Sequence, residues 1–134
     1  MDIILTGGDG LIGTYLKERL QKEGYKIIKS INIRSGFDIK DILSYKPKDK
    51  IDLFIHAAAH CKINESVSNP DKAFDSNILG TYEVFEFCRA NKIPRIIYFS
   101  SSRVLSPEKN PTLQVNSSAK SFVGHIFNVM ALNM

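Results

Sequence analysis

The sequence contains few cysteines and no long hydrophobic segment. Cys61 and Cys88 are its two cysteines, and they do not form a Cys-x-x-Cys pair. No apolar run approaches the ~20 residues that cross a bilayer, and we expect no secretory signal before the first strand. These features predict a cytoplasmic protein with reduced thiols and no membrane partner.

An excess of charge of either sign is also absent. Lys and Arg number 18 against 14 Asp and Glu, a net charge of +4, and the basic residues are interspersed with acids. This pattern is typical of a solvated surface and argues against a nucleic-acid partner. Hydrophobic residues make up 43% of the 134 residues, which is enough to build the core of one domain.

Strand-like and helix-like segments alternate along the first hundred residues. Short β-rich runs predict strands at 3–6, 25–33, 51–56 and 95–100. Apolar spacing predicts helices at 11–23, 39–45 and 70–91. The last helix should bury one apolar face, formed by Ala73, Phe74, Ile78, Tyr82, Phe85 and Cys88. The order β-α-β-α-β-α-β predicts an α/β fold, a Rossmann-like doubly wound parallel sheet that is truncated after the fourth strand.

A glycine-rich segment separates the first predicted strand from the first predicted helix. It reads Gly7-Gly8-Asp9-Gly10-Leu11-Ile12-Gly13. Glycines here permit a tight turn and a close backbone approach to a pyrophosphate. Free N–H groups at the helix start, near Gly10, Leu11 and Ile12, would then bind the anion. The context favours a dinucleotide-binding loop, with NAD or NADP as cofactor, over an ordinary glycine-rich turn.

This glycine segment and several later motifs together resemble the extended short-chain dehydrogenase/reductases, which include NAD(P)-dependent nucleotide-sugar epimerases and dehydratases. The later motifs are Phe37-Asp38-Ile39-Lys40-Asp41, His56-Ala57-Ala58-Ala59, Glu65-Ser66-Val67-Ser68-Asn69-Pro70, Asn77-Ile78-Leu79-Gly80-Thr81 and Ile97-Tyr98-Phe99-Ser100-Ser101-Ser102. The resemblance covers roughly residues 1–109, and the segment from Glu65 is most similar to UDP-hexose 4-epimerases. It implies transient hydride transfer on a nucleotide-sugar substrate, and a homodimer for the full-length relative.

The resemblance also assigns residues to the cofactor. They are Gly7, Gly10, Leu11, Ile12, Gly13, Asp38, Ile39, Ala57, Ala58, Ala59, Asn77 and Ser100. Asp38 would accept a hydrogen bond from the adenine amino group, or cap the short helix that follows, or do both. The three alanines would admit the cofactor or simply pack tightly. Asn77 is a poor helix former, and it would support the cofactor region or lie exposed.

The serines after the fourth predicted strand are candidates for catalysis. Ligands of open α/β sheets bind at the carboxyl ends of strands, and Ser101 matches the family's catalytic serine. Ser100 and Ser102 are alternatives, as is a plain serine-rich turn. Relatives usually continue Val-Tyr-Gly, whereas this chain reads Val104-Leu105-Ser106.

The family's catalytic base has no match in this sequence. That base is a tyrosine whose pKa is lowered by a lysine four residues later. No tyrosine follows Tyr98, so we expect a single chain of this sequence to be inactive. We interpret His56 as structural, and His60 lacks a partner at metal-ligand spacing.

The preference between NAD and NADP depends on the residues after the second predicted strand. An NAD enzyme usually has an acidic residue there, which accepts hydrogen bonds from the ribose hydroxyls. This segment reads Ser30-Ile31-Asn32-Ile33-Arg34-Ser35 and contains no acid. Arg34 could pair with the 2′-phosphate of NADP, or it could be a solvated loop charge.

The last part of the sequence departs from the family pattern. We expect a partial NAD(P)-binding domain at residues 1–111 and a poorly packed tail at 112–134 that is read out of frame. If the codons from Pro111 to Asn116 are read one base earlier, they can spell Tyr-Thr-Ala-Ser-Lys, the missing base and lysine. Two alternatives to an enzyme stay open: a non-catalytic NAD(P)-binding sensor, and a non-functional product of a frameshifted gene.

Overall fold

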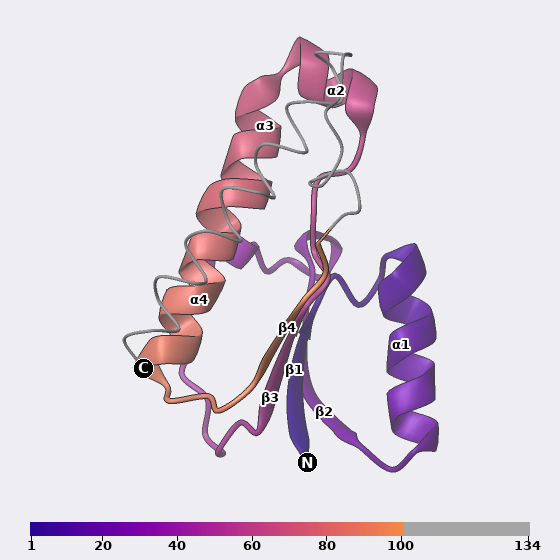
Figure 1. Ribbon diagram of the computed structural model, residues 1–134, viewed down its shortest axis with the longest axis vertical. Coiled ribbons are helices and arrows are strands. Elements are labelled where there is room, and N and C mark those ends of the chain that lie inside the picture. The colour runs from indigo at the N-terminus through magenta and orange to yellow at the C-terminus, as the bar shows by residue number, and fades with distance from the viewer. Residues whose placement is uncertain (101–134) are drawn as a thin grey trace. The chain divides into compact units, whose positions relative to one another are not determined.

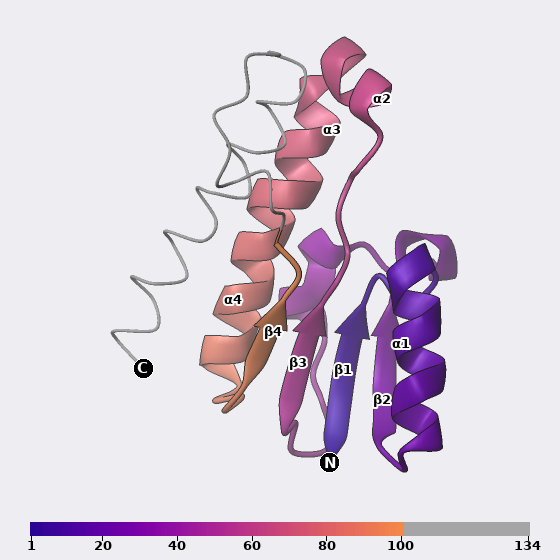
Figure 2. The same cartoon turned by 45° about the vertical axis from the view of Figure 1, so that its right-hand side comes forward.

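Four parallel strands form a single sheet in the part of the chain that the structure, a computed structural model, describes: residues 1–100. The strands are β1 (Asp2–Thr6), β2 (Lys26–Ile31), β3 (Leu53–His56) and β4 (Ile96–Tyr98). Their order is β2-β1-β3-β4 (Figures 1 and 2), and every adjacent pair is parallel. The chain builds outward from β1 in one direction and then returns to the other side of β1, which confirms the doubly wound Rossmann-like fold.

The chain consists of two compact units. The sheet unit comprises Met1–Ala58 and Glu83–Phe99, and the helical unit contains Ala59–Tyr82. The sheet unit carries helix α1 (Leu11–Lys22) and two 3₁₀ helices, η1 (Ile33–Ser35) and η2 (Ile39–Ser44). In the helical unit, α2 (Ile63–Ser68) and α3 (Pro70–Phe74) precede a π-helical segment, η3 (Asp75–Leu79). Helix α4 (Gly80–Ala90) begins in the helical unit and ends in the sheet unit.

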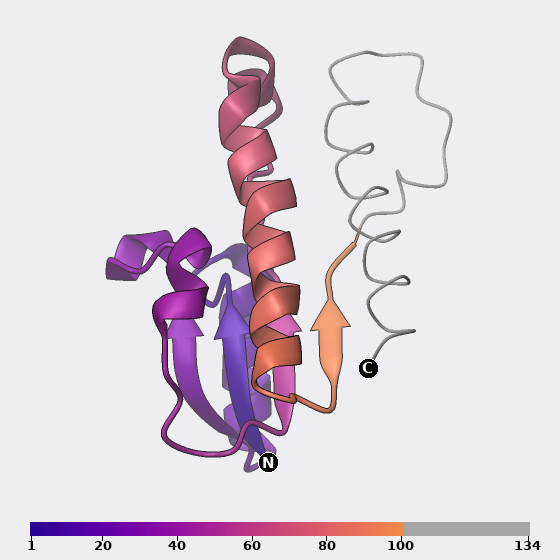
Figure 3. The same cartoon turned by 90° about the vertical axis from the view of Figure 1, so that its left-hand side faces the viewer.

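The two central strands, β1 and β3, are buried on both faces of the sheet, whereas the edge strands β2 and β4 are mostly half-buried. Alternate residues of β1 and β3 point in opposite directions. Ile3, Leu5, Leu53 and Ile55 form one buried cluster, against which Leu16 and Leu20 of α1 pack. On the opposite face Phe54 of β3 contacts Phe87 of α4, with ring centroids 6.0 Å apart. Figure 3 shows α4 on the side of the sheet away from α1.

Several details differ from the sequence-based expectation. The segment at 39–45 forms a 3₁₀ helix, and α2 was not predicted. The helix expected at 70–91 is present, but η3 interrupts its α-helical bonding. Its expected apolar face is partly wrong, because Phe74 and Tyr82 are exposed while Asn77 and Thr81 are buried. In the described part of the chain, no helix is both long enough and apolar enough to cross a membrane.

Candidate functional site

The glycine loop packs against the backbone of Ala57 and Ala58, at the carboxyl end of β3. Gly7 has a φ of +75°, a left-handed conformation that favours glycine. A Cβ at Gly7 would lie 2.7 Å from the Ala58 nitrogen and 2.8 Å from the Ala57 carbonyl carbon. Because these are backbone atoms, no side-chain movement can make room. The small residues on both sides thus let two backbone segments meet at the carboxyl end of the sheet.

The same loop leaves the start of α1 open. Gly10 is the N-cap residue and offers no side-chain cap, and its carbonyl accepts the Thr14 N–H at 2.9 Å. A helix leaves its first N–H groups without an intrahelical partner, here those of Leu11 and Ile12. Both side chains are exposed, Leu11 to 80%. Gly13 is buried beneath them, where a Cβ would collide with the Gly7 carbonyl oxygen.

A buried hydroxyl and imidazole hold the two strand ends together. Thr6 Oγ1 accepts a hydrogen bond from the Ala58 N–H at 3.2 Å and lies 2.7 Å from His56 Nδ1. The His56 ring is fully buried and lies 5.5 Å from the Tyr98 ring. These contacts support the structural interpretation of His56. The sequence analysis missed Thr6, for which the signal was a polar residue at the end of an apolar strand.

The segment after β2 contacts the glycine loop through an amide. Asn32 Oδ1 accepts the Asp9 N–H at 3.2 Å, and Asn32 Nδ2 donates to Ser30 Oγ at 3.2 Å. Asn32 therefore takes the place next to the loop where the sequence lacks an acid. Arg34 lies in η1 and is exposed.

The predicted adenine-binding residue caps a helix. Asp38 is the N-cap of η2, and its Oδ1 accepts the Lys40 N–H at 3.0 Å. This confirms the capping role that the sequence left open, and the adenine contact stays a prediction. The next residue, Ile39, is buried in the sheet unit. Of the three alanines, Ala57 and Ala58 are half-buried and Ala59 is exposed.

In the helical unit, Asn77 binds the loop that follows β3. Its Oδ1 accepts the His60 N–H at 2.7 Å, and its Nδ2 donates to the His60 carbonyl at 2.9 Å. The amide thus forms with His60 the same pair of hydrogen bonds that the backbone of a neighbouring strand would form. Asn77 is only 2% exposed, so the alternative of an exposed position is wrong. It lies in η3, and π-helical segments occur frequently at functional sites.

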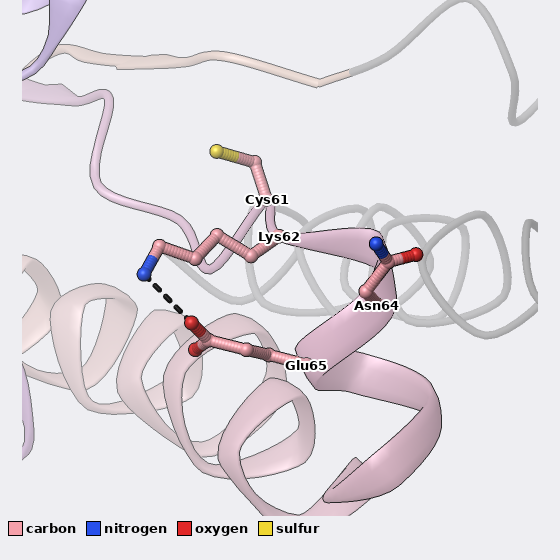
Figure 4. A pocket seen from close by; sticks show the side chains of 4 residues that line it. All are labelled: Cys61, Lys62, Asn64 and Glu65. Carbon is pink, nitrogen blue, oxygen red and sulfur yellow. Dashed lines mark hydrogen bonds and ion pairs between the residues drawn. The ribbon is translucent and has the colours of Figure 1, made fainter.

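An open pocket lies beside this loop in the helical unit. Cys61, Lys62, Asn64 and Glu65 line it (Figure 4). Lys62 Nζ donates to Glu65 Oε1 at 2.7 Å, and this bond lowers the pKa of Glu65. His60 Nε2 lies 3.8 Å from Glu65 Oε2. Within residues 1–100, no three His, Cys, Asp or Glu side chains are grouped so as to hold a metal ion.

The two thiols and one tyrosine differ sharply in environment. Cys61 is exposed and Cys88 is buried, and neither forms a disulfide. Burial raises the pKa of the Cys88 thiol far above its ordinary value. Burial also raises the pKa of Tyr98 on β4.

The serine candidates lie at the end of the described residues or beyond it. Ser100 is exposed, and the catalytic candidate Ser101 lies outside the described residues, as do Ser102 and the predicted tail.

Comparisons with known proteins agree on one family. The sequence model of the NAD dependent epimerase/dehydratase family matches residues 3–123. A putative UDP-glucose 4-epimerase from Methanocaldococcus jannaschii is 31% identical over 81% of this chain and 40% of its own length. The UDP-glucose 4-epimerase of Streptomyces lividans is 26% identical over 83% of this chain and 39% of its own length. The chain therefore spans about two fifths of these curated relatives.

Solved structures show the same fold. The UDP-glucose 4-epimerase of Thermus thermophilus, in complex with NAD, superposes with a TM-score of 0.80 at 20% identity, covering 99% of this chain and 51% of that one. The enzyme from Stenotrophomonas maltophila, with bound NAD and formylated UDP-arabinopyranose, reaches 0.83 at 20% identity, covering 99% and 49%. With the family match over residues 3–123, the chain belongs to the NAD-dependent epimerase/dehydratase family.

Proposed function

We propose that this chain is the cofactor-binding part of an NAD(P)-dependent nucleotide-sugar epimerase or dehydratase. The observation that carries the proposal is the glycine loop. Gly7 and Gly13 have no room for a Cβ, and the first turn of α1 has no side-chain cap. Such a loop fits a pyrophosphate, because uncapped N–H groups and the helix dipole both stabilise an anion.

The position of the loop in the sheet supports the same proposal. β1 and β3 are neighbours, but the chain leaves β1 in one direction and β3 in the other. Dinucleotides bind outside the carboxyl ends of strands at such a topological switch point. Bound NAD(P) would supply the hydride acceptor there. The chain's residues would hold the pyrophosphate at Gly10, Leu11 and Ile12, with Ala57 and Ala58 lining the approach.

The substrate is proposed from the relatives, and the assembly from the family resemblance alone. The relatives include a UDP-glucose 4-epimerase, a putative one and a dTDP-D-glucose 4,6-dehydratase, and one solved neighbour holds a UDP-sugar derivative. We infer a nucleotide sugar as substrate, Ser101 as the residue that would bind its reacting oxygen, and a homodimer for the full-length relative. The cytoplasmic setting, like the homodimer, stays a prediction.

Loss of binding after a substitution at Gly10 would test the loop. Gly10 has an ordinary φ of −78°, and a Cβ there would meet only the Gly7 carbonyl oxygen, at 3.2 Å. Gly10→Leu should therefore fold but place a side chain across the uncapped N–H groups. Calorimetry should show dinucleotide binding by the parent and by Gln21→Leu, at the far end of α1, and none by Gly10→Leu. Equal affinities for all three proteins would refute the loop assignment.

We also propose that Arg34 favours NADP. Asn32 stands beside the glycine loop where NAD enzymes usually have an acid, and Arg34 is exposed two residues later. NADP should bind more tightly than NAD, and Arg34→Ala should abolish the difference. A clear NAD preference that Arg34→Ala leaves unchanged would overturn the assignment.

An activity assay tests the expectation that this chain is inactive by itself. The sequence contains no Tyr-x-x-x-Lys after Ser101, so a polypeptide of these 134 residues should bind dinucleotide but turn over no nucleotide sugar. Turnover by the purified polypeptide would contradict this.

The encoding DNA tests the expectation that residues 112–134 are read out of frame. If the codons from Pro111 to Asn116, read one base earlier, do not spell a tyrosine and a lysine four residues apart, the frameshift explanation is refuted.

A further inference from the structure

Lys29 of β2 lies against two aromatic rings. Its Nζ is 5.4 Å from the centroid of the Phe37 ring and 5.5 Å from the centroid of the Tyr45 ring. Both distances lie within the range of a cation–π interaction. No acid pairs with Lys29 among residues 1–100, so the two rings are the groups that face its charge there.

The two rings belong to a row of aromatic residues that begins in the core. Phe54 of β3 contacts Phe87 of α4, and Phe87 contacts Tyr45 at 6.2 Å between centroids. Tyr45 in turn meets the edge of Phe37 at 6.4 Å and an interplanar angle of 85°. Phe54 and Phe87 are buried, whereas Phe37 and Tyr45 are half-buried. Lys29 therefore contacts the outer end of the row, at the segment between β2 and η2.

Phe37 immediately precedes Asp38, the proposed adenine-binding residue. Asp38 Oδ1 accepts the Lys40 N–H, and residues 1–100 offer no second hydrogen bond to this carboxylate. The other carboxylate oxygen can therefore accept a bond from a ligand. Its direction depends on the backbone at Phe37 and Asp38. The Phe37 N–H donates to the Asn32 carbonyl at 3.3 Å, and the Phe37 ring and the first turn of η2 hold the same backbone.

We propose that Lys29 is a positioning residue, which holds Phe37 by its charge and so aims Asp38 at the 6-amino group of adenine. The inference rests on the proposed dinucleotide binding and adds a determinant of base recognition to it. Lys29 does not touch the ligand. Its effect should consequently depend on whether the ligand carries the amino group that Asp38 accepts.

Calorimetric titrations with NAD and with its hypoxanthine analogue, deamino-NAD, test this role. Deamino-NAD has the same ribose and pyrophosphate groups but lacks the 6-amino group. The parent should bind NAD more tightly than deamino-NAD. Lys29→Met, which keeps the length but loses the charge, should weaken NAD binding about threefold to tenfold, the size of a cation–π contact, and leave deamino-NAD nearly unchanged.

Three variants separate this role from a general loss of charge or structure. Lys26→Met removes a lysine on the same strand that pairs with Asp2 and, within residues 1–100, faces no ring. It should keep the parent preference for NAD. Lys29→Arg keeps a cation that stacks on rings and should restore the preference. Phe37→Leu removes the ring while Lys29 remains, and it should lose the preference as Lys29→Met does.

The outcomes are distinct. If the parent binds neither dinucleotide, the proposed function fails. If the parent prefers NAD and both Lys29→Met and Phe37→Leu keep that preference, the positioning role is refuted while dinucleotide binding stands. Equal weakening of NAD and deamino-NAD by Lys29→Met would also refute it, because a purely structural defect would not depend on the amino group. Circular dichroism on each variant verifies that the titrated protein is folded.

Discussion

At the scale of single residues, backbone contacts decide which glycines can be replaced. Gly13 is buried in the first turn of α1, and a Cβ there would lie 2.7 Å from the Gly7 carbonyl carbon and 2.7 Å from the Gly8 Cα. Backbone atoms in a closed loop cannot move aside as a flexible side chain can. Gly10, three residues earlier, is less crowded, because a Cβ there would meet one atom, the Gly7 carbonyl oxygen, at 3.2 Å. The same residue type therefore serves packing at Gly13 and access to the helix start at Gly10.

Gly13→Ala should destabilise the fold by about 1–3 kcal/mol, because overpacking forces the loop backbone to shift. The free energy of unfolding, measured in urea, is the appropriate readout. Gln21→Ala, on an exposed position of the same helix, should change it by less than about 0.5 kcal/mol. A Gly13→Ala variant as stable as Gln21→Ala would show that the loop can relax around a methyl group.

The two thiols should react at different rates. Cys61 is exposed, whereas Cys88 is buried and its pKa is raised. A reagent therefore cannot reach the Cys88 sulfur, and the thiol stays protonated at neutral pH. A thiol-reactive probe at neutral pH should label Cys61 rapidly and Cys88 only after unfolding in denaturant. Mass spectrometry of the digested protein assigns each label. Labelling of Cys88 as fast as Cys61 in native conditions would contradict its burial.

At the scale of elements, Asn77 connects the π-helical segment of the long helix to the loop after β3. In η3 it uses both ends of its amide on the backbone of His60. The buried stripe runs through Ala73, Asn77, Thr81 and Cys88, so small and polar residues supply part of it.

Asn77→Leu should lower the free energy of unfolding by about 1–3 kcal/mol, because it leaves the His60 N–H and carbonyl without their partner. The side chains are similar in volume, so the loss reports hydrogen bonds more than packing. Lys72→Ala, on an exposed position of the preceding helix, should have little effect. If Asn77→Leu were as stable as the parent, the amide could not be what fixes the loop.

At the scale of the whole molecule, burial of ionisable groups ties stability to pH. The folded protein keeps Cys88 and Tyr98 protonated above their ordinary pKa values of 9.0 and 10.0, because burial disfavours the charged forms. Above these values the unfolded chain loses protons that the folded chain retains. The stability that these groups contribute is complete below pH 9.0 and declines as the pH rises toward their folded pKa values.

The free energy of unfolding should accordingly fall from about pH 9 upward, by as much as about 1.4 kcal/mol per pH unit through Cys88. Urea unfolding at several alkaline pH values measures this slope. Cys88→Ala should make the decline shallower, whatever its effect on stability at neutral pH. A parent and a Cys88→Ala variant with the same slope would show that the thiol ionises alike in both states.

Local patterns in the sequence predicted the glycine loop, the strands, most helices and the winding of the sheet. They sufficed because a dinucleotide loop depends on consecutive residues: an apolar strand, glycines without Cβ, and an open helix start. The family resemblance added Asp38, Asn77 and the serines as candidates. The match over residues 3–123 confirms the family, while the roles of those residues stay predictions.

The tertiary structure decided what depends on partners distant in sequence. Phe74 and Tyr82 were expected to be buried, because the apolar residues at helical spacing were assigned to one face; the buried face instead passes through Asn77 and Thr81. Asn77 is buried because the His60 backbone, 17 residues away, satisfies its amide. Lys29 meets Phe37 and Tyr45 only because β2 and η2 fold together. Sequence periodicity records local geometry, whereas burial of a polar group depends on which partner the fold brings to it.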